Sequence, residues 1–118
     1  MLRALILHPE PLVRRYVQSC LVREVTVVAE AATAGDASAR IAETLPDVVF
    51  ADLLLQGETG FQLAHRLREE VPGSVTVLLT DAAETALPYL NRVARANGAA
   101  GVLPYAALAD GAFSSLAA

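Results

Sequence analysis

The sequence predicts an α/β fold in which a five-stranded parallel sheet is covered by helices on both faces. Short apolar runs alternate five times with stretches of helical spacing, and this alternation implies right-handed crossovers between parallel strands. The runs are apolar at successive rather than alternate positions, which is typical of strands buried on both faces. The 118 residues fit one domain, residues 1–118, with a core of its own.

The composition argues against several classes of function. A net charge of −4 without a basic cluster disfavours direct nucleic-acid binding by this domain. The uncharged stretch 98–109 is short and contains Gly101 and Pro104, so no membrane span is expected. Cys20 is the single cysteine, which predicts a small buried residue and a cytoplasmic location, since one thiol forms no internal disulfide. The chain contains no lysine.

The first half of the chain predicts two strands and two helices. The first strand covers 2–7, and a helix begins near Pro11 because proline is tolerated in the first helical turn. The second strand covers 25–29, and the loop 33–36 caps a second helix. The apolar positions expected on the inner faces of these helices are Val13, Val17, Cys20, Leu21, Ala37, Ile41 and Leu45.

The middle of the chain predicts the central strand and the helix that follows it. The strand covers 48–51, directly before Asp52. Thr59 and Gln62 have the spacing of a capping box, and the resulting helix ends at Pro72-Gly73. Its expected inner positions are Leu63, Ala64, Leu67 and Val71.

The last third predicts two strands and two helices. Strands are expected at 75–79 and 100–103, separated by a helix over 84–97 that Gly98 closes in a left-handed conformation. A last helix, expected to be short, carries Leu108, Ala112, Phe113 and Leu116. Five such units favour the flavodoxin-like strand order 2-1-3-4-5, a three-layer doubly wound sandwich with five helices. In that order the strand ends bring the following residues to one crevice: His8, Glu10, Asp52, Thr80, Pro104 and Tyr105.

Residues Pro46 to Gly60 resemble a known segment. They follow the pattern P-D-hydrophobic-D-x-x-M-P-x-x-x-G of the phosphoacceptor region in bacterial response-regulator receiver domains, which act in two-component signalling. The resemblance places Asp52 at the phosphorylated aspartate and Gln56 at the family's usual proline. It also implies that Thr80 stands at the hydroxyl that binds the phosphoryl group.

The same resemblance implies a degenerate site around Asp52. His8 and Pro9 stand where the family has the acidic pair that binds Mg²⁺, and Tyr105 stands where it has a lysine. Other replaced or nearby positions are Glu10, Asp81 in place of a small residue, and Val102 in place of the switch aromatic. For His8 we expect a hydrogen bond to Asp52 or to the backbone. The Tyr105 ring either enters the crevice or covers the edge of the core.

These departures predict an atypical receiver that is not an enzyme and holds no cofactor or metal. It would act in signal transduction and transcription regulation through a sensor kinase, an effector domain after Ala118, or self-association through the last two helices and strand five. The alternative is a competent receiver in which a histidine kinase phosphorylates Asp52 and Glu10 helps Asp52 to bind Mg²⁺. A flavin or small-ligand protein would need a Ser/Thr/Gly-rich loop after strand one, which residues 8–11 lack. A hydrolase would need a base near Thr80.

Overall fold

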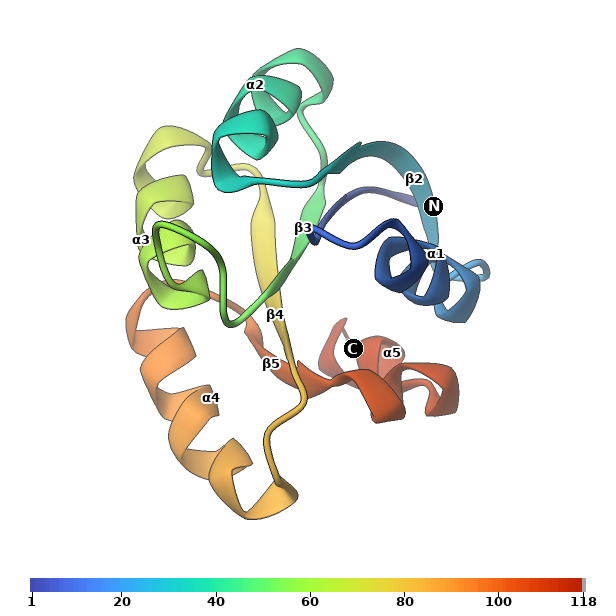
Figure 1. The fold of residues 1–118 in the computed structure, drawn as a ribbon, viewed down its shortest axis with the longest axis vertical. Coiled ribbons are helices and arrows are strands. Elements are labelled where there is room, and N and C mark those ends of the chain that lie inside the picture. Colours follow the sequence, from blue (N-terminus) through green and yellow to red (C-terminus); the bar gives the residue numbers. More distant parts are fainter. Residues whose placement is uncertain (118) are drawn as a thin grey trace.

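The structure, a computed structural model, describes residues 1–117 and contains a five-stranded parallel sheet in the order β2-β1-β3-β4-β5 (Figure 1). The strands are β1 (Leu2–Leu7), β2 (Val25–Ala31), β3 (Val48–Asp52), β4 (Val75–Thr80) and β5 (Gly101–Pro104). This confirms the predicted fold class and strand order. All four strand pairings are parallel, so the carboxyl ends of β1, β3, β4 and β5 lie along one rim.

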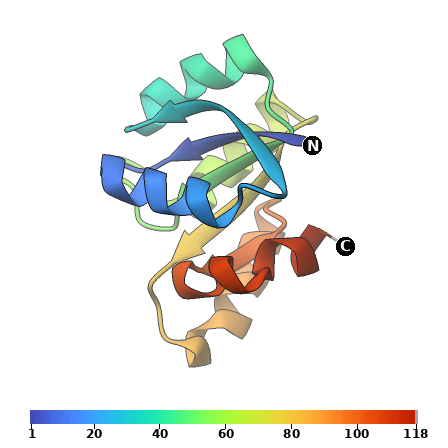
Figure 2. The ribbon, with the colours of Figure 1, turned by 90° about the vertical axis from the view of Figure 1, so that its right-hand side faces the viewer.

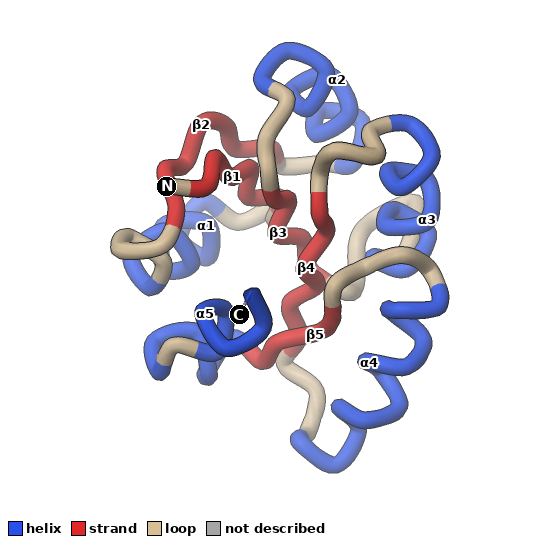
Figure 3. Tube along the Cα trace, turned by 180° about the vertical axis from the view of Figure 1, so that it is seen from behind, coloured by secondary structure: helices blue, strands red, loops and turns tan. Residues whose placement is uncertain are grey.

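Helices cover both faces of the sheet. The helices α2 (Ala34–Thr44), α3 (Gly60–Glu70) and α4 (Leu87–Ala96) lie on one face, and α1 (Pro11–Cys20) and α5 (Ala112–Ala117) lie on the other (Figure 1). Figure 2 looks onto the side that carries α1 and α5, and Figure 3 shows from behind how the strands separate the two groups of helices. No helix within residues 1–117 is long and apolar enough to cross a membrane.

The core has two layers because successive residues of each central strand point to opposite faces. Leu5 and Val49 face α2, α3 and α4, whereas Ile6 and Phe50 face α1 and α5. Each of these four side chains is at most 1% exposed, as expected for strands buried on both faces. The buried layers hold β1 and β3 in register, with Leu5 opposite Val49, and thereby fix where both strands end.

The helix starts follow the sequence signals. Pro11 occupies the first turn of α1, and the Thr33 hydroxyl accepts a hydrogen bond from the Asp36 amide at the start of α2. Thr59 and Gln62 form the predicted capping box at α3, with each side chain bonded to the other residue's backbone amide. Gly98 has a φ of 88°, as predicted for the residue that closes α4.

Three expectations were wrong in detail. Leu45 does not lie on the inner face of α2, since it is 64% exposed and left-handed with a φ of 45°. The cause is Pro46, which disfavours a helical conformation at the residue before it. Residues 84–86 form a 3-10 segment, η1 (Glu84–Ala86), ahead of α4. Leu108 belongs to a second 3-10 segment, η2 (Tyr105–Asp110), which Gly111 separates from α5 with a φ of 83°.

Candidate functional site

Asp52 is the last residue of β3 and lies on the rim formed by the carboxyl ends of the strands. His8 follows β1, Thr80 ends β4, and Tyr105 follows β5, so three neighbouring strands deliver side chains towards this rim. The Asp52 side chain is 16% exposed, which leaves its carboxylate partly shielded from water. The topology therefore brings His8, Asp52 and Tyr105 together, three of the residues that the strand order predicted at one crevice.

Both carboxylate oxygens of Asp52 accept hydrogen bonds. Oδ1 accepts from the backbone N–H of Leu54 at 2.7 Å, and Oδ2 accepts from the hydroxyl of Tyr105. Nε2 of His8 lies 3.6 Å from the same Oδ2. The aspartate is thus held by an amide and a phenol, with an imidazole beside them.

The hydrogen bonds of His8 define its tautomer. Nδ1 accepts from the backbone N–H of Glu10 at 3.0 Å, so this nitrogen carries no proton and the ring is neutral, with its hydrogen on Nε2. That hydrogen faces Asp52. The two partners considered for His8 from the sequence, backbone and Asp52, are therefore both next to it.

The Tyr105 hydroxyl reaches Asp52 in the crevice, while the same side chain packs against the core layer beneath α1 and α5, so it combines the two positions that the sequence left open. Its ring meets the His8 ring edge-on, with centroids 6.2 Å apart and an interplanar angle of 83°. Burial raises the pKa of the Tyr105 phenol above the usual tyrosine range, and the hydrogen bond to Asp52 raises it further. The phenol is therefore a neutral donor at physiological pH.

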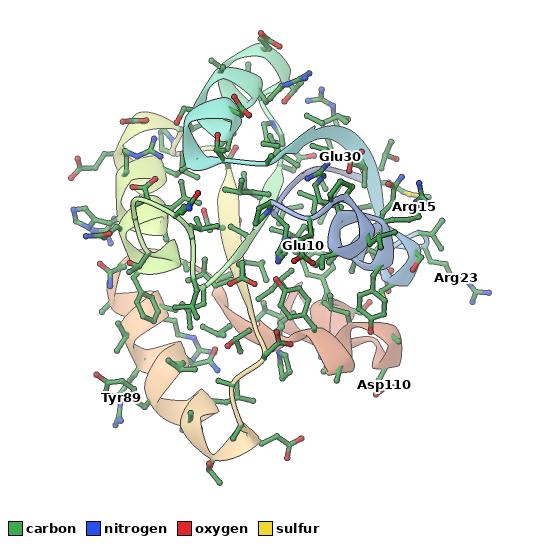
Figure 4. The ribbon with its side chains drawn as sticks, viewed as in Figure 1. Glu10, Arg15, Arg23, Glu30, Tyr89 and Asp110 are labelled. Carbon is green, nitrogen blue, oxygen red and sulfur yellow. The ribbon has the colours of Figure 1, made fainter. Side chains whose placement is uncertain are left out.

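The other predicted residues make no hydrogen bond or ion pair with the Asp52 carboxylate within residues 1–117. Thr80 is buried, and its Oγ1 accepts from the Ala82 amide at 3.0 Å, which ties the hydroxyl to the following loop. Val102 is buried in the layer beneath α4. Glu10 is exposed at the start of α1, where Figure 4 labels it. Within residues 1–117, no hydrogen bond or ion pair joins Glu10 or Asp81 to Asp52.

Two arginines that the sequence analysis did not single out support the rim. Arg14 donates from Nη1 to the His8 carbonyl at 2.6 Å and from Nε to Glu30 at 3.0 Å. Arg66 of α3 bonds Glu58 at 2.7 Å, in the loop after Asp52, and also Ser38 at 2.8 Å, in α2. The hydrogen bond to Glu58 raises the pKa of Arg66. Both arginines bridge segments distant in sequence, so no spacing signal reveals these contacts.

The side chains around Asp52 offer few ligands to a magnesium ion. Mg²⁺ requires near-octahedral oxygen coordination, usually with one or two carboxylates. Within residues 1–117, no three His, Cys, Asp or Glu side chains are grouped closely enough to hold a metal. Pro9 offers no side-chain oxygen, and both oxygens of Asp52 already accept hydrogen bonds.

A model of the response regulator receiver domain matches residues 4–104. This chain belongs to the response-regulator receiver family. The receiver domain is accordingly a signal-transduction module of a two-component response regulator. No match was found among curated proteins.

Solved structures agree with this assignment over nearly the whole receiver domain. The signal receiver domain of the putative response regulator NarL from Mycobacterium tuberculosis is 26% identical with a TM-score of 0.79, covering 98% of this chain and 96% of that one. A LuxR-family two-component response regulator from Aurantimonas sp. is 28% identical with a TM-score of 0.80, covering 99% and 86%. The isolated receiver domain of RcsB from Salmonella enterica serovar Typhimurium, solved with the phosphomimetic BeF₃⁻, has a TM-score of 0.81 at 18% identity, covering 98% and 88%. This third likeness concerns the fold alone.

Proposed function

We propose that this receiver domain signals without phosphorylation of Asp52, as an atypical regulatory module that binds a protein partner. The observation that carries the proposal is the hydrogen bond from the neutral Tyr105 phenol to Asp52, at the position where the family resemblance expects a lysine. The phenol donates a hydrogen bond to the carboxylate but brings no positive charge to the site.

The electrostatics of phosphoryl transfer support this reading. Transfer to a carboxylate needs a divalent cation and cationic donors for the charge on the phosphoryl oxygens. Removing one preorganised donor typically slows a reaction about 100- to 1,000-fold. Here the lysine is replaced, and the acidic pair has become His8 and Pro9. The two losses together make phosphoryl transfer very slow.

The output side of the module is the face built from α4, β5 and α5. Tyr89 is 61% exposed and projects from α4, away from α1 (Figure 4), with the Arg92 guanidinium 6.0 Å from its ring centre. An exposed aromatic beside an arginine is the kind of pair enriched in protein interfaces. The likeness to the LuxR-family regulator supports, as the partner of this face, an effector domain that regulates transcription. The other candidate partner is a second copy of the chain.

The test is incubation of the protein with Mg²⁺ and acetyl phosphate, followed by intact-mass spectrometry. We expect no phosphoryl adduct on the wild type, and the same result for Asp52→Asn. The triple variant His8→Asp, Pro9→Asp, Tyr105→Lys restores the acidic pair and the lysine on the same fold. It should gain an Mg²⁺-dependent adduct that disappears when Asp52→Asn is added.

A phosphoryl adduct on the wild-type protein would instead identify a receiver that can be phosphorylated. An Mg²⁺-dependent adduct on Asp52 of the wild type contradicts the proposal and favours the alternative in which Glu10 helps to bind the metal. Glu10→Gln then distinguishes that case, because it removes the only charged oxygen ligand that the alternative adds. If neither the wild type nor the triple variant reacts, binding of beryllofluoride and Mg²⁺ to the triple variant, followed by NMR, shows whether the restored site forms.

A further inference from the structure

A cavity of about 290 Å³ opens beside Tyr105, between α1 and the end of β4. Its lining residues are His8, Leu12, Val13, Tyr16, Asp81 and Tyr105. The volume is close to the lower end of the range for small-molecule sites. The cavity shares His8 and Tyr105 with the Asp52 site, but its other lining residues come from α1 and from the end of β4, and Asp52 itself does not line it.

The walls of this cavity are largely apolar and aromatic. Leu12 is 74% exposed although it lies beside two tyrosine rings, so an apolar group bound there would cover surface that now contacts water. The Tyr16 hydroxyl donates to the backbone carbonyl of Tyr105 at 3.3 Å, which fixes the two aromatic residues relative to each other. The cavity therefore has a preformed aromatic wall.

The charge at the cavity is negative. Asp81 lines it, and within residues 1–117 no hydrogen bond or ion pair engages the Asp81 carboxylate. Asp52 adds a second carboxylate behind Tyr105. His8 is neutral, because its Nδ1 accepts the Glu10 amide hydrogen.

The nearest arginines do not neutralise this charge. The Arg14 guanidinium is engaged with the His8 carbonyl and with Glu30. Arg15 extends from the outer side of α1 and Arg23 from the turn after it, both away from the sheet (Figure 4). One carboxylate, aromatic rings and two apolar side chains thus meet in this cavity, without an arginine among its lining residues.

We propose that this cavity binds an organic cation, a guanidinium or ammonium group on a short apolar stem. The charged end pairs with Asp81 and lies against the tyrosine rings, as cations do in aromatic sites. The stem covers Leu12. Such a ligand would bind next to the contact between Tyr105 and Asp52, and it gives the module an input that needs no phosphoryl donor.

The experiment is an NMR titration of the ¹⁵N-labelled protein with butylguanidinium, and with butylurea as a neutral ligand of nearly the same shape. We expect saturable amide shifts centred on Leu12, Tyr16, Asp81 and Tyr105, with butylguanidinium binding more tightly than butylurea. Asp81→Asn should weaken butylguanidinium binding by about threefold or more, because an exposed ion pair is lost. Glu84→Gln is the matched control, since it removes an exposed carboxylate from η1, outside the cavity.

A third titration distinguishes two sources of the cation, an arginine side chain of a protein partner and a free small molecule. If the capped tripeptide acetyl-Gly-Arg-Gly-amide binds at least as well as butylguanidinium, the cavity accepts the arginine of a protein partner; if it is excluded, the ligand is a free small cation. Equal affinity for butylguanidinium and butylurea overturns the proposal, as does equal weakening by Asp81→Asn and Glu84→Gln, or the absence of saturable shifts. No phosphoryl donor is present, so these outcomes are independent of whether Asp52 can be phosphorylated.

Discussion

Tyr105 gives the rim its chemical character because it joins the end of β5 to the end of β3 through one side chain. Its hydroxyl is bonded to Asp52, and its backbone carbonyl accepts from Tyr16 of α1. A hydrogen bond to a charged acceptor in a partly shielded place is stronger than one between neutral groups. The residue at the position where the family resemblance expects a lysine is therefore a structural link between three elements.

Tyr105→Phe should destabilise the domain by about 1–3 kcal/mol, because a half-buried carboxylate loses a hydrogen-bond donor while the ring is kept. The measurement is the free energy of unfolding from urea denaturation followed by circular dichroism. Tyr89→Phe is the control, since Tyr89 is 61% exposed and surface changes usually stay within about 0.5 kcal/mol. Equal effects of the two substitutions would show that the bond to Asp52 contributes no stability.

At the scale of elements, the edge of the sheet formed by β5 is covered by a side chain of α4. β5 is the last strand, and Asn91 of α4 accepts from the Val102 amide at 2.9 Å and donates to the Val102 carbonyl at 3.5 Å. The amide group imitates a neighbouring strand, which is one way to block edge-to-edge association. Gly101 makes room for it, because a Cβ there would lie 2.8 Å from Oδ1 of Asn91.

Asn91→Ala should cost about 1–3 kcal/mol of unfolding free energy, since the buried Val102 amide loses its partner. It should also increase self-association, measured by sedimentation velocity at rising protein concentration. Glu69→Gln, on the exposed side of α3 and outside the α4-β5-α5 face, is the control and should change neither quantity appreciably. An Asn91→Ala protein that stays as stable and as monomeric as the control would contradict the role of this side chain.

At the scale of the whole molecule, the buried phenol makes global stability depend on pH in the alkaline range. The folded chain holds the Tyr105 proton more tightly than the unfolded chain does, because burial and Asp52 raise its pKa. The stabilising contribution is complete below about pH 10, the ordinary tyrosine value. It is lost as the pH rises further, since the unfolded state then releases a proton that the folded state retains.

We therefore expect the urea midpoint of the wild type to fall as the pH rises above about 10, and to fall less steeply in Tyr105→Phe. Some decline should remain in the variant, because a hydrogen bond with Cys20 also raises the pKa of Tyr16. Absorbance at 295 nm, which reports tyrosine ionisation, should show Tyr105 titrating together with unfolding. Parallel midpoint curves for the two proteins would contradict this assignment.

The apolar runs and helix signals were enough to predict the sheet order and the rim, because burial on both faces leaves few alternatives for these strands. The capping box at Thr59 formed as predicted, since its two residues act locally. Leu45 was misplaced because helical periodicity outweighed the effect of the proline after it. The meeting of Tyr105 with Asp52 lay beyond prediction, since it depends on the direction of one side chain across 53 positions of sequence.

Arg66 connects the loop after Asp52 to α2, which lies on the opposite face of the sheet from α1. Arg66 lies on α3 and donates hydrogen bonds to both Glu58 and Ser38, so it connects this loop to α2 as well as to α3. A displacement of the loop would therefore disturb the contact with α2 as well as the contact with α3. The position of α2 is thus tied through Arg66 to the loop that follows Asp52, on the face of the sheet opposite α1.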